Sequence, residues 1–122
     1  MKISNIKLTE KEEEIMLRLW EYGPCSVKTI IDHLPEPKPH FNTVSTFVRI
    51  LEQKGYVERK ESNGRGFLYY AVLPKSSYRK NVVRKLVSDY FGSSFSMISA
   101  LVSDNEITPE QLRELLDMIE QK

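Results

Sequence analysis

Residues 42–55, NTVSTFVRILEQKG, decide the predicted fold because they join a regular apolar stripe to an unusual polar face. Four apolar residues fall at i, i+3, i+4 and i+7, the spacing of one helix side: Val44, Phe47, Val48 and Leu51. The other side carries small and hydrogen-bonding side chains instead of the Glu and Lys of an ordinary solvated surface. We predict a helix with Asn42 as its N-cap and Gly55 in a left-handed conformation at its end.

Two further helices are predicted before this stretch. Residues 9–12, TEKE, match a capping box, and Gly23-Pro24 ends the helix that follows. Ser26 can cap a second, short helix. The prolines at 35, 37 and 39 then forbid helix and predict a stiff loop.

After the third helix the period changes to that of strands. YVERKE (56–61) and FLYYAV (67–72) flank a glycine-containing loop, which predicts a β-hairpin. The fold class is therefore mainly α with a small β-hairpin, and the order helix, helix, helix, hairpin predicts a winged helix-turn-helix. We expect a winged-helix DNA-binding domain in residues 1–74 and a helical dimerisation region in residues 75–122.

Charge is distributed unevenly along the chain, although the formal net charge is only +1. Residues 28–85 hold 12 basic and 5 acidic side chains, a net charge of +7, and residues 86–122 hold 2 basic and 7 acidic, a net charge of −5. A basic middle segment favours a polyanion partner. Chance asymmetry in a short chain is the alternative.

The polar face of the third helix predicts contact with double-stranded DNA. Short hydroxyl side chains let a helix backbone approach phosphates and base edges, and Arg49 can reach a guanine or a phosphate. The second helix and the hairpin add hydroxyl and basic groups. The alternatives are an ordinary solvated helix and a hairpin whose charges prevent edge-to-edge pairing. The predicted DNA-binding residues are Ser26, Lys28, Thr29, Asn42, Thr43, Ser45, Thr46, Arg49, Arg59, Lys60 and Arg65.

The remaining chain is predicted to be helical, over residues 76–91, 94–103 and from a capping box at residues 108–111 onward. Its apolar stripes are too short for a private core, so two copies are expected to pack as a homodimer. The alternative is a tail that folds back on its own winged domain. The predicted dimerisation residues are Tyr78, Val82, Leu86, Tyr90, Phe95, Ile98, Leu101, Val102, Leu112, Leu115, Leu116 and Ile119.

Several classes of function find no support in the sequence. There is no phosphate-binding glycine loop, nucleophile elbow or metal-ligand cluster, so we expect no enzyme, cofactor or metal site. Residues 12–14, three glutamates, are expected to be a solvated helix start. No long apolar run or signal peptide is present, which predicts no membrane insertion and a cytoplasmic protein. Cys25 is expected to be a packed side chain, with a redox-sensitive thiol as the alternative.

Most of the chain resembles a known family. The stretches LTEKEEEIMLRLWEYGPCSVKTI (8–30), NTVSTFVRILEQKGYVER (42–59), GFLYYAVL (66–73) and EITPEQLRELLDMI (106–119) are similar to the penicillinase-repressor (BlaI/MecI/CopY) family of bacterial winged-helix regulators. The resemblance implies a homodimeric repressor on a dyad operator, controlling a β-lactam-resistance or related stress-response operon. It places Thr43, Ser45, Thr46 and Arg49 on the DNA. Ser45 stands where relatives often carry arginine, so the operator sequence does not carry over.

Induction differs between members of that family. In antibiotic-responsive members a membrane-bound sensor with a metalloprotease domain leads to cutting between an asparagine and a phenylalanine, and the matching bond here is Ala100–Leu101. The asparagine is absent, and so are the cysteine pairs of copper-responsive members. The alternative function is a winged-helix protein-interaction module without sequence-specific DNA binding, because fold does not dictate function.

Overall fold

The computed structural model describes residues 6–64 and 66–122. The chain divides into two compact units, Met1–Arg79 and Lys80–Lys122. The division falls within helix α4 (Lys75–Leu86), about one turn beyond the boundary expected at residue 74.

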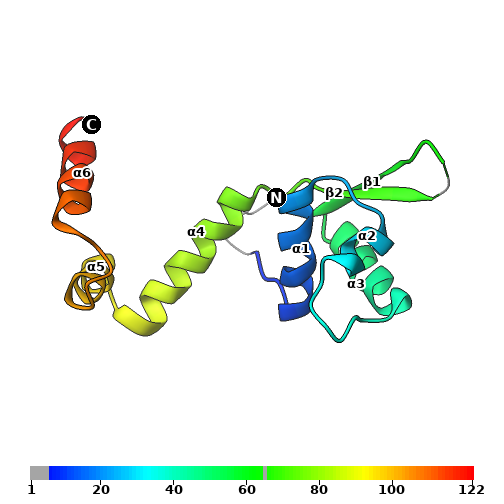
Figure 1. Ribbon diagram of the computed structural model, residues 1–122, viewed down its shortest axis with the longest axis horizontal. Coiled ribbons are helices and arrows are strands. Elements are labelled where there is room, and N and C mark those ends of the chain that lie inside the picture. The colour runs from blue at the N-terminus through cyan, green and yellow to red at the C-terminus, as the bar shows by residue number, and fades with distance from the viewer. Residues whose placement is uncertain (1–5, 65) are drawn as a thin grey trace. The chain divides into compact units, whose positions relative to one another are not determined.

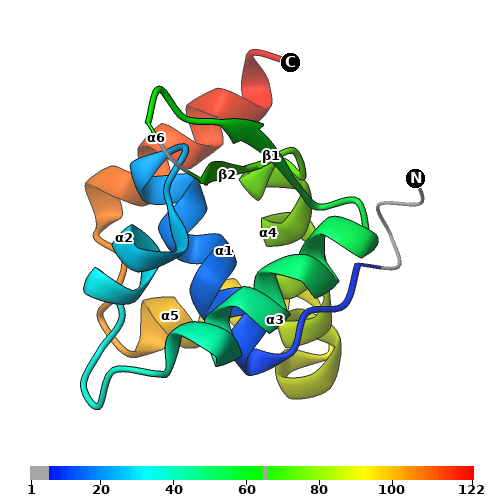
Figure 2. The ribbon, with the colours of Figure 1, turned by 90° about the vertical axis from the view of Figure 1, so that its right-hand side faces the viewer.

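Unit 1 is a winged helix-turn-helix, as the sequence predicts (Figures 1 and 2). Its elements are α1 (Glu10–Tyr22), α2 (Val27–Asp32), α3 (Phe41–Gln53), β1 (Val57–Glu61) and β2 (Phe67–Ala71). The two strands pair antiparallel, with Val57 opposite Ala71 and Glu61 opposite Phe67. Cys25 adds a bridge to the free edge of β2 through two backbone hydrogen bonds with Tyr69.

Helix boundaries follow the predicted caps with one exception. Thr9 and Glu12 form the capping box of α1, and the Ser26 hydroxyl accepts the Thr29 backbone N–H. The expected N-cap at Asn42 is wrong, because α3 begins at Phe41 after an extended His40 that makes no side-chain cap bond. The last proline of the loop is at position 39, so nothing prevents helical backbone from starting at Phe41, one residue before Asn42. Gly55 has the expected positive φ, 82°.

One apolar core holds unit 1 together. Helix α3 contributes Val44, Val48 and Leu51, while Trp20 and Phe47 pack at the edge. The buried core residues are Ile6, Ile15, Met16, Leu19, Cys25, Val27, Ile30, Leu34, Val44, Val48, Leu51, Val57 and Leu73. A fully buried Val or Leu contributes roughly 1.5–3 kcal/mol, so this cluster is the main stabilising force of the unit.

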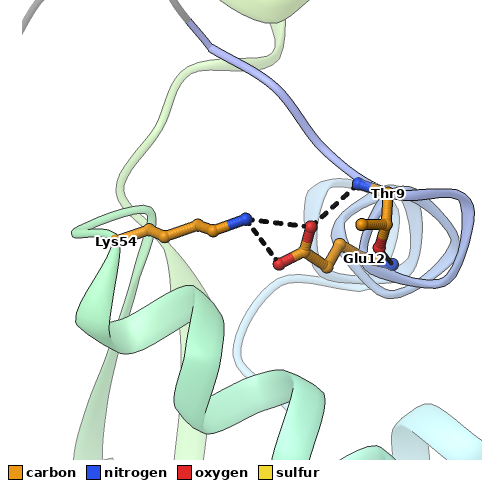
Figure 3. Close-up of polar contacts among 3 residues, drawn as sticks. All are labelled: Thr9, Glu12 and Lys54. Carbon is orange, nitrogen blue, oxygen red and sulfur yellow. Dashed lines mark hydrogen bonds and ion pairs between the residues drawn. The ribbon is translucent and has the colours of Figure 1, made fainter.

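An ion pair between the buried Glu12 and the partly exposed Lys54 joins the start of α1 to the end of α3 (Figure 3). The Glu12 carboxylate is 2% exposed and accepts the Thr9 backbone N–H at 2.8 Å and the Lys54 ammonium at 2.8 and 3.0 Å. The expectation of a solvated Glu12 is therefore wrong. Burial alone would raise the pKa of Glu12, but the bonds from Lys54 and Thr9 and the Lys54 charge outweigh it, and the pKa lies below 4.5.

The first turn of α4 also belongs to unit 1. The Tyr78 ring lies 5.7 Å from the Trp20 ring, and its hydroxyl donates to Glu13. Burial and this carboxylate raise the pKa of Tyr78. The Trp20 indole N–H donates to the Leu73 carbonyl at 2.8 Å, so the chain leaving the hairpin is held against α1.

Unit 2 consists of helices that bury none of their side chains in the single chain. After α4, a π-helical turn (Val87–Phe91) replaces the end of the expected regular helix and stops at Gly92. Helices α5 (Ser94–Ser103) and α6 (Pro109–Glu120) follow, and α6 has the predicted Thr108 capping box. No residue from 80 to 122 is buried.

Replacing Glu12 by Gln should lower the free energy of unfolding by about 1–2 kcal/mol. Hydrogen bonds to a buried charged group contribute roughly 1.5–3 kcal/mol, and partial exposure of Lys54 reduces that figure. Glu10→Gln in the same turn, where the side chain is exposed, is the matched control. Urea denaturation should show a lower midpoint at unchanged slope for Glu12→Gln only; equal midpoints for both variants would contradict the assigned role of the pair.

The difference between wild type and Glu12→Gln should shrink on acidification. The folded-state pKa of Glu12 lies below its ordinary value of 4.5, so the unfolded chain takes up the proton first as the pH falls. The stabilisation is complete above that value and is lost as the pH drops through the folded-state pKa. Unfolding curves at several pH values between 7 and 3 test this, and a constant difference would refute it.

Candidate nucleic-acid interface

The outer side of α3 presents a line of polar residues. Asn42, Thr46, Arg49 and Gln53 fall at i, i+4, i+7 and i+11, all are exposed, and they lie opposite the buried stripe of the same helix. The Thr46 hydroxyl donates to the Asn42 carbonyl at 2.9 Å, which leaves its oxygen free to accept. We call these four residues the outer stripe.

Two predicted contact residues flank the outer stripe instead of lying on it. Ser45 is half-buried on one side, and Thr43 is exposed on the other side, where it lines a hollow shared with α1. Gln53 completes the outer stripe but is not among the predicted contact residues. The sequence signal for Gln53 is its position four residues after Arg49, which puts both side chains on the same side of the helix.

The first turn of α3 keeps its backbone donors available. Helices α1, α2, α5 and α6 each have a hydroxyl side chain that accepts an N–H of the first turn, whereas His40 provides none to α3. The backbone N–H groups around Asn42 and Thr43 therefore receive no cap from the His40 side chain and lie at the positive end of the helix dipole. An oxyanion is the favoured partner for such a helix start.

Helix α3 and the hairpin meet at a polar hollow. Arg49, Glu52 and Gln53 line it together with Arg59 of β1, and it measures about 450 Å³. Arg59 Nε forms an ion pair with the Glu52 carboxylate at 3.6 Å, and the Arg59 guanidinium lies 4.4 Å from the centre of the Phe67 ring. The two predicted arginines therefore face one depression, and Arg59 is held in place on two sides.

The predicted basic cluster of the hairpin is divided between two faces. Alternation along β1 puts Arg59 on the side of α3, and it puts Lys60 on the opposite side, 5.9 Å from the Tyr70 ring. The Tyr70 hydroxyl donates to Glu58 on that second side. The expectation of one cluster is wrong for this pair because neighbouring strand residues point in opposite directions. Arg65, the third member, lies outside the described residues.

The α2 residues have unequal access to a ligand. The Ser26 and Thr29 hydroxyls lie 3.0 Å apart and are half-buried, and the Ser26 oxygen also caps the helix. Lys28 is exposed and forms no ion pair with another of the described residues. Of the three predicted residues, Lys28 offers the group best suited to reach a phosphate.

Much of the positive charge of the middle segment lies on α4 and not on the winged surface. Lys75, Arg79, Lys80, Arg84 and Lys85 belong to this helix, and Lys85 donates to Asp89 at 2.8 Å. The segment charge of +7 therefore overstates the charge of the predicted DNA surface.

Most predicted dimerisation residues lie on exposed apolar faces of unit 2. An apolar hollow of about 440 Å³ is lined by Ile98 of α5 and by the stripe Leu112, Leu115, Leu116 and Ile119 of α6. Val82, Leu86, Tyr90, Phe95 and Val102 are exposed, and Leu101 is half-buried. Tyr78 differs, because it packs on Trp20 in unit 1.

The bond between Ala100 and Leu101 lies inside α5. The Ala100 carbonyl accepts the Asp104 N–H at 2.9 Å, and the Leu101 carbonyl accepts the Glu106 N–H at 2.9 Å. A protease requires an extended chain, so cutting here would need α5 to unwind first.

The single cysteine has the environment of a packed side chain. Cys25 is 4% exposed, and burial raises the pKa of its thiol, whereas a redox-sensitive cysteine needs a lowered pKa. Among the described residues, no three His, Cys, Asp or Glu side chains gather as ligands for a metal. None of the described helices has the length and apolar character needed to cross a bilayer.

Comparison with known proteins places these features in a family context. The family model for the penicillinase repressor matches residues 8–121. The methicillin resistance regulatory protein MecI of Staphylococcus aureus (strain N315) is 22% identical over 118 residues, which are 95% of each chain. An uncharacterized 16.5 kDa protein of Latilactobacillus sakei, encoded in the ptsI 3′ region, is 25% identical over 119 residues, 95% of this chain and 80% of that protein.

Among solved structures, a MarR/EmrR family transcriptional regulator from Acinetobacter sp. ADP1 has a TM-score of 0.48 at 19% identity. The likeness covers 96% of this chain and 75% of that one.

Proposed function

The chain belongs to the penicillinase repressor family of transcriptional regulators, and on that premise we propose that it represses transcription as a homodimer bound to a palindromic operator. The observation that carries the proposal is the outer stripe of α3. It combines a base-reading arginine with small polar side chains on the helix that a helix-turn-helix places in the major groove.

The roles of the surrounding groups follow from their positions. Arg49 and Gln53 are proposed to read base edges, because both are exposed on the outer stripe and carry long hydrogen-bonding side chains. Arg59 and Lys28 are proposed to bind phosphates on either side of α3, and the free N–H groups of its first turn to bind a third. Phosphate contacts fix register and orientation, whereas the two side chains of α3 specify sequence.

The homodimer is proposed because unit 2 has no buried residues of its own. The apolar stripe of α6 and Ile98 of α5 would lose contact with water against a second copy, while the acidic residues of α6 fall between the stripe positions. A two-fold axis would then present two α3 helices, which is the geometry that a palindromic operator requires. Val82, Leu86 and Tyr90 of the preceding helical segment are also exposed, and the proposed dimer interface includes them.

The relatives named for methicillin resistance suggest which genes to test. We propose a β-lactam-resistance or related stress-response operon as the target. Control by a membrane sensor-protease is the family route we would test second, because the bond Ala100–Leu101 lies within a hydrogen-bonded helix.

Arg49→Ala should reduce the preference of the protein for particular bases. Lys28→Ala should instead lower the affinity for all DNA sequences about equally. Loss of a bidentate base contact costs roughly 1–3 kcal/mol of discrimination at one base pair. Loss of a phosphate contact lowers the slope of log affinity against log salt concentration by about 1. Operator fragments selected from genomic DNA, followed by fluorescence anisotropy at several salt concentrations, measure both effects. An unchanged base preference in Arg49→Ala would refute the reading role of the outer stripe.

The wild-type protein in the same assay separates the proposal from a protein-interaction module. If the wild-type protein binds genomic fragments and its affinity falls steeply as the salt concentration rises, DNA binding is supported, because neutralising phosphates releases counterions. No retention at low salt would instead support the interaction module.

Leu116→Gln should weaken self-association by roughly a hundredfold or more. Each dimer would lose two buried leucines, and each contributes about 1.5–3 kcal/mol. Glu114→Gln, two residues earlier on the same helix but off the apolar stripe, is the matched control. Sedimentation equilibrium measures the dissociation constants, and equal constants for the two variants would place the dimer contact elsewhere.

A further inference from the structure

Unit 1 contains a hollow that the proposed DNA contacts do not explain. It lies between the first half of α1, the loop that joins α2 to α3, and the first half of α3, and it has a volume of about 200 Å³. Of the outer stripe and its flanks, only Thr43 reaches it.

The lining and the volume suit one small ring. Ile15, Leu34, Val44 and Phe47 provide apolar walls. A cavity of about 150 Å³ with such walls binds benzene in another protein, so about 200 Å³ accommodates a ring with one short substituent. The apolar part of the lining offers water no hydrogen-bond partner, which makes an apolar ring favourable against it.

The hollow is held open by its loop. Pro35, Pro37 and Pro39 line it, and proline restricts the backbone on both sides of each ring. The Lys38 ammonium donates to the Asp32 carbonyl at 2.9 Å and also to the Leu34 carbonyl, which ties the loop to the end of α2. Because the hollow exists before binding, a ligand needs little free energy to rearrange the protein.

The charged residues at the hollow favour a cation. Lys11, Glu14 and Glu36 line it, so two carboxylates face one ammonium. Lys11 lies 3.9 Å from Glu14, at the far limit of an ion pair, while Glu36 accepts the Lys38 backbone N–H at 3.2 Å. Both carboxylates keep oxygen lone pairs for another donor.

We propose that this hollow binds a small molecule with a single apolar ring and a protonated amine. The ring lies against Ile15, Val44 and Phe47, and the amine lies toward Glu14 and Glu36. The ligand also contacts Thr43 beside the outer stripe, so its binding lowers affinity for DNA. That last consequence rests on the proposed function, whereas ligand binding does not.

Titration of the full-length ¹⁵N-labelled protein with three probes at pH 7 tests the site. Benzylamine should bind saturably and roughly three- to tenfold more tightly than benzyl alcohol or benzoate, because exposed charge pairs contribute modestly. The backbone amide signals of Ile15, Val44 and Phe47 should shift. Benzoate binding as tight as benzylamine, or shifts scattered away from these residues, would overturn the proposal.

Matched variants test the charge preference. The double variant Glu14→Gln/Glu36→Gln should bind benzylamine and benzyl alcohol equally, because the amide side chains keep the shape and remove the charge. Glu21→Gln, further along α1 and outside the hollow, should keep the preference for benzylamine. A preference that survives in the double variant would show that these carboxylates do not select the ligand.

The consequence for DNA has a separate measurement. Saturating benzylamine should lower the affinity of the protein for a selected operator fragment severalfold, and benzoate at the same concentration should not. Unchanged affinity would refute the coupling to α3. If the protein binds no DNA, the proposed function fails, and the titration still decides whether the site exists.

Discussion

Helix α3 can be buried on one side only, and the rest of the molecule depends on that constraint. Burial of Val44, Val48 and Leu51 fixes its rotation, which leaves the outer stripe in water. The ion pair between Glu12 and Lys54 fixes its far end against the start of α1. An unpaired carboxylate at a site 2% exposed would cost several kcal/mol, so arrangements of α3 that break the pair are disfavoured.

Polar residues of the winged surface therefore divide between structure and binding. The Ser26 hydroxyl caps the start of α2 and meets the Thr29 hydroxyl, while the neighbouring Lys28 side chain is exposed. Glu52 positions Arg59 beside Arg49. A residue type that suits DNA binding is thus insufficient evidence, because the same hydroxyl or guanidinium can be occupied within the protein.

The two units use their apolar residues differently. Unit 1 buries a continuous core and leaves polar groups outside, whereas unit 2 leaves Phe95, Leu116 and Ile119 more than half exposed. Exposed apolar faces of this kind are typical of association surfaces. The proposal of a homodimer follows from this contrast, and the charge difference between the middle and the end of the sequence is consistent with it.

Local sequence determined the elements and their order. Capping boxes at Thr9 and Thr108, the stop at Gly23 and the stripe around Val48 each act within a few residues, so period and cap chemistry suffice to predict them. The fold class and the polar side of α3 were predictable for the same reason. The misplaced start of α3 is a local error, made because Asn42 is a good cap by type and His40, the observed cap position, is not.

Only the tertiary structure decided which side chains meet. Glu12 and Lys54 are 42 positions apart, and Tyr78 and Glu13 are 65 apart, so no local pattern connects them. The shared hollow of Arg49 and Arg59 depends on packing of the hairpin beside α3. Sequence period fixes the direction of a side chain on its own element, but the partner that it meets depends on how distant elements pack.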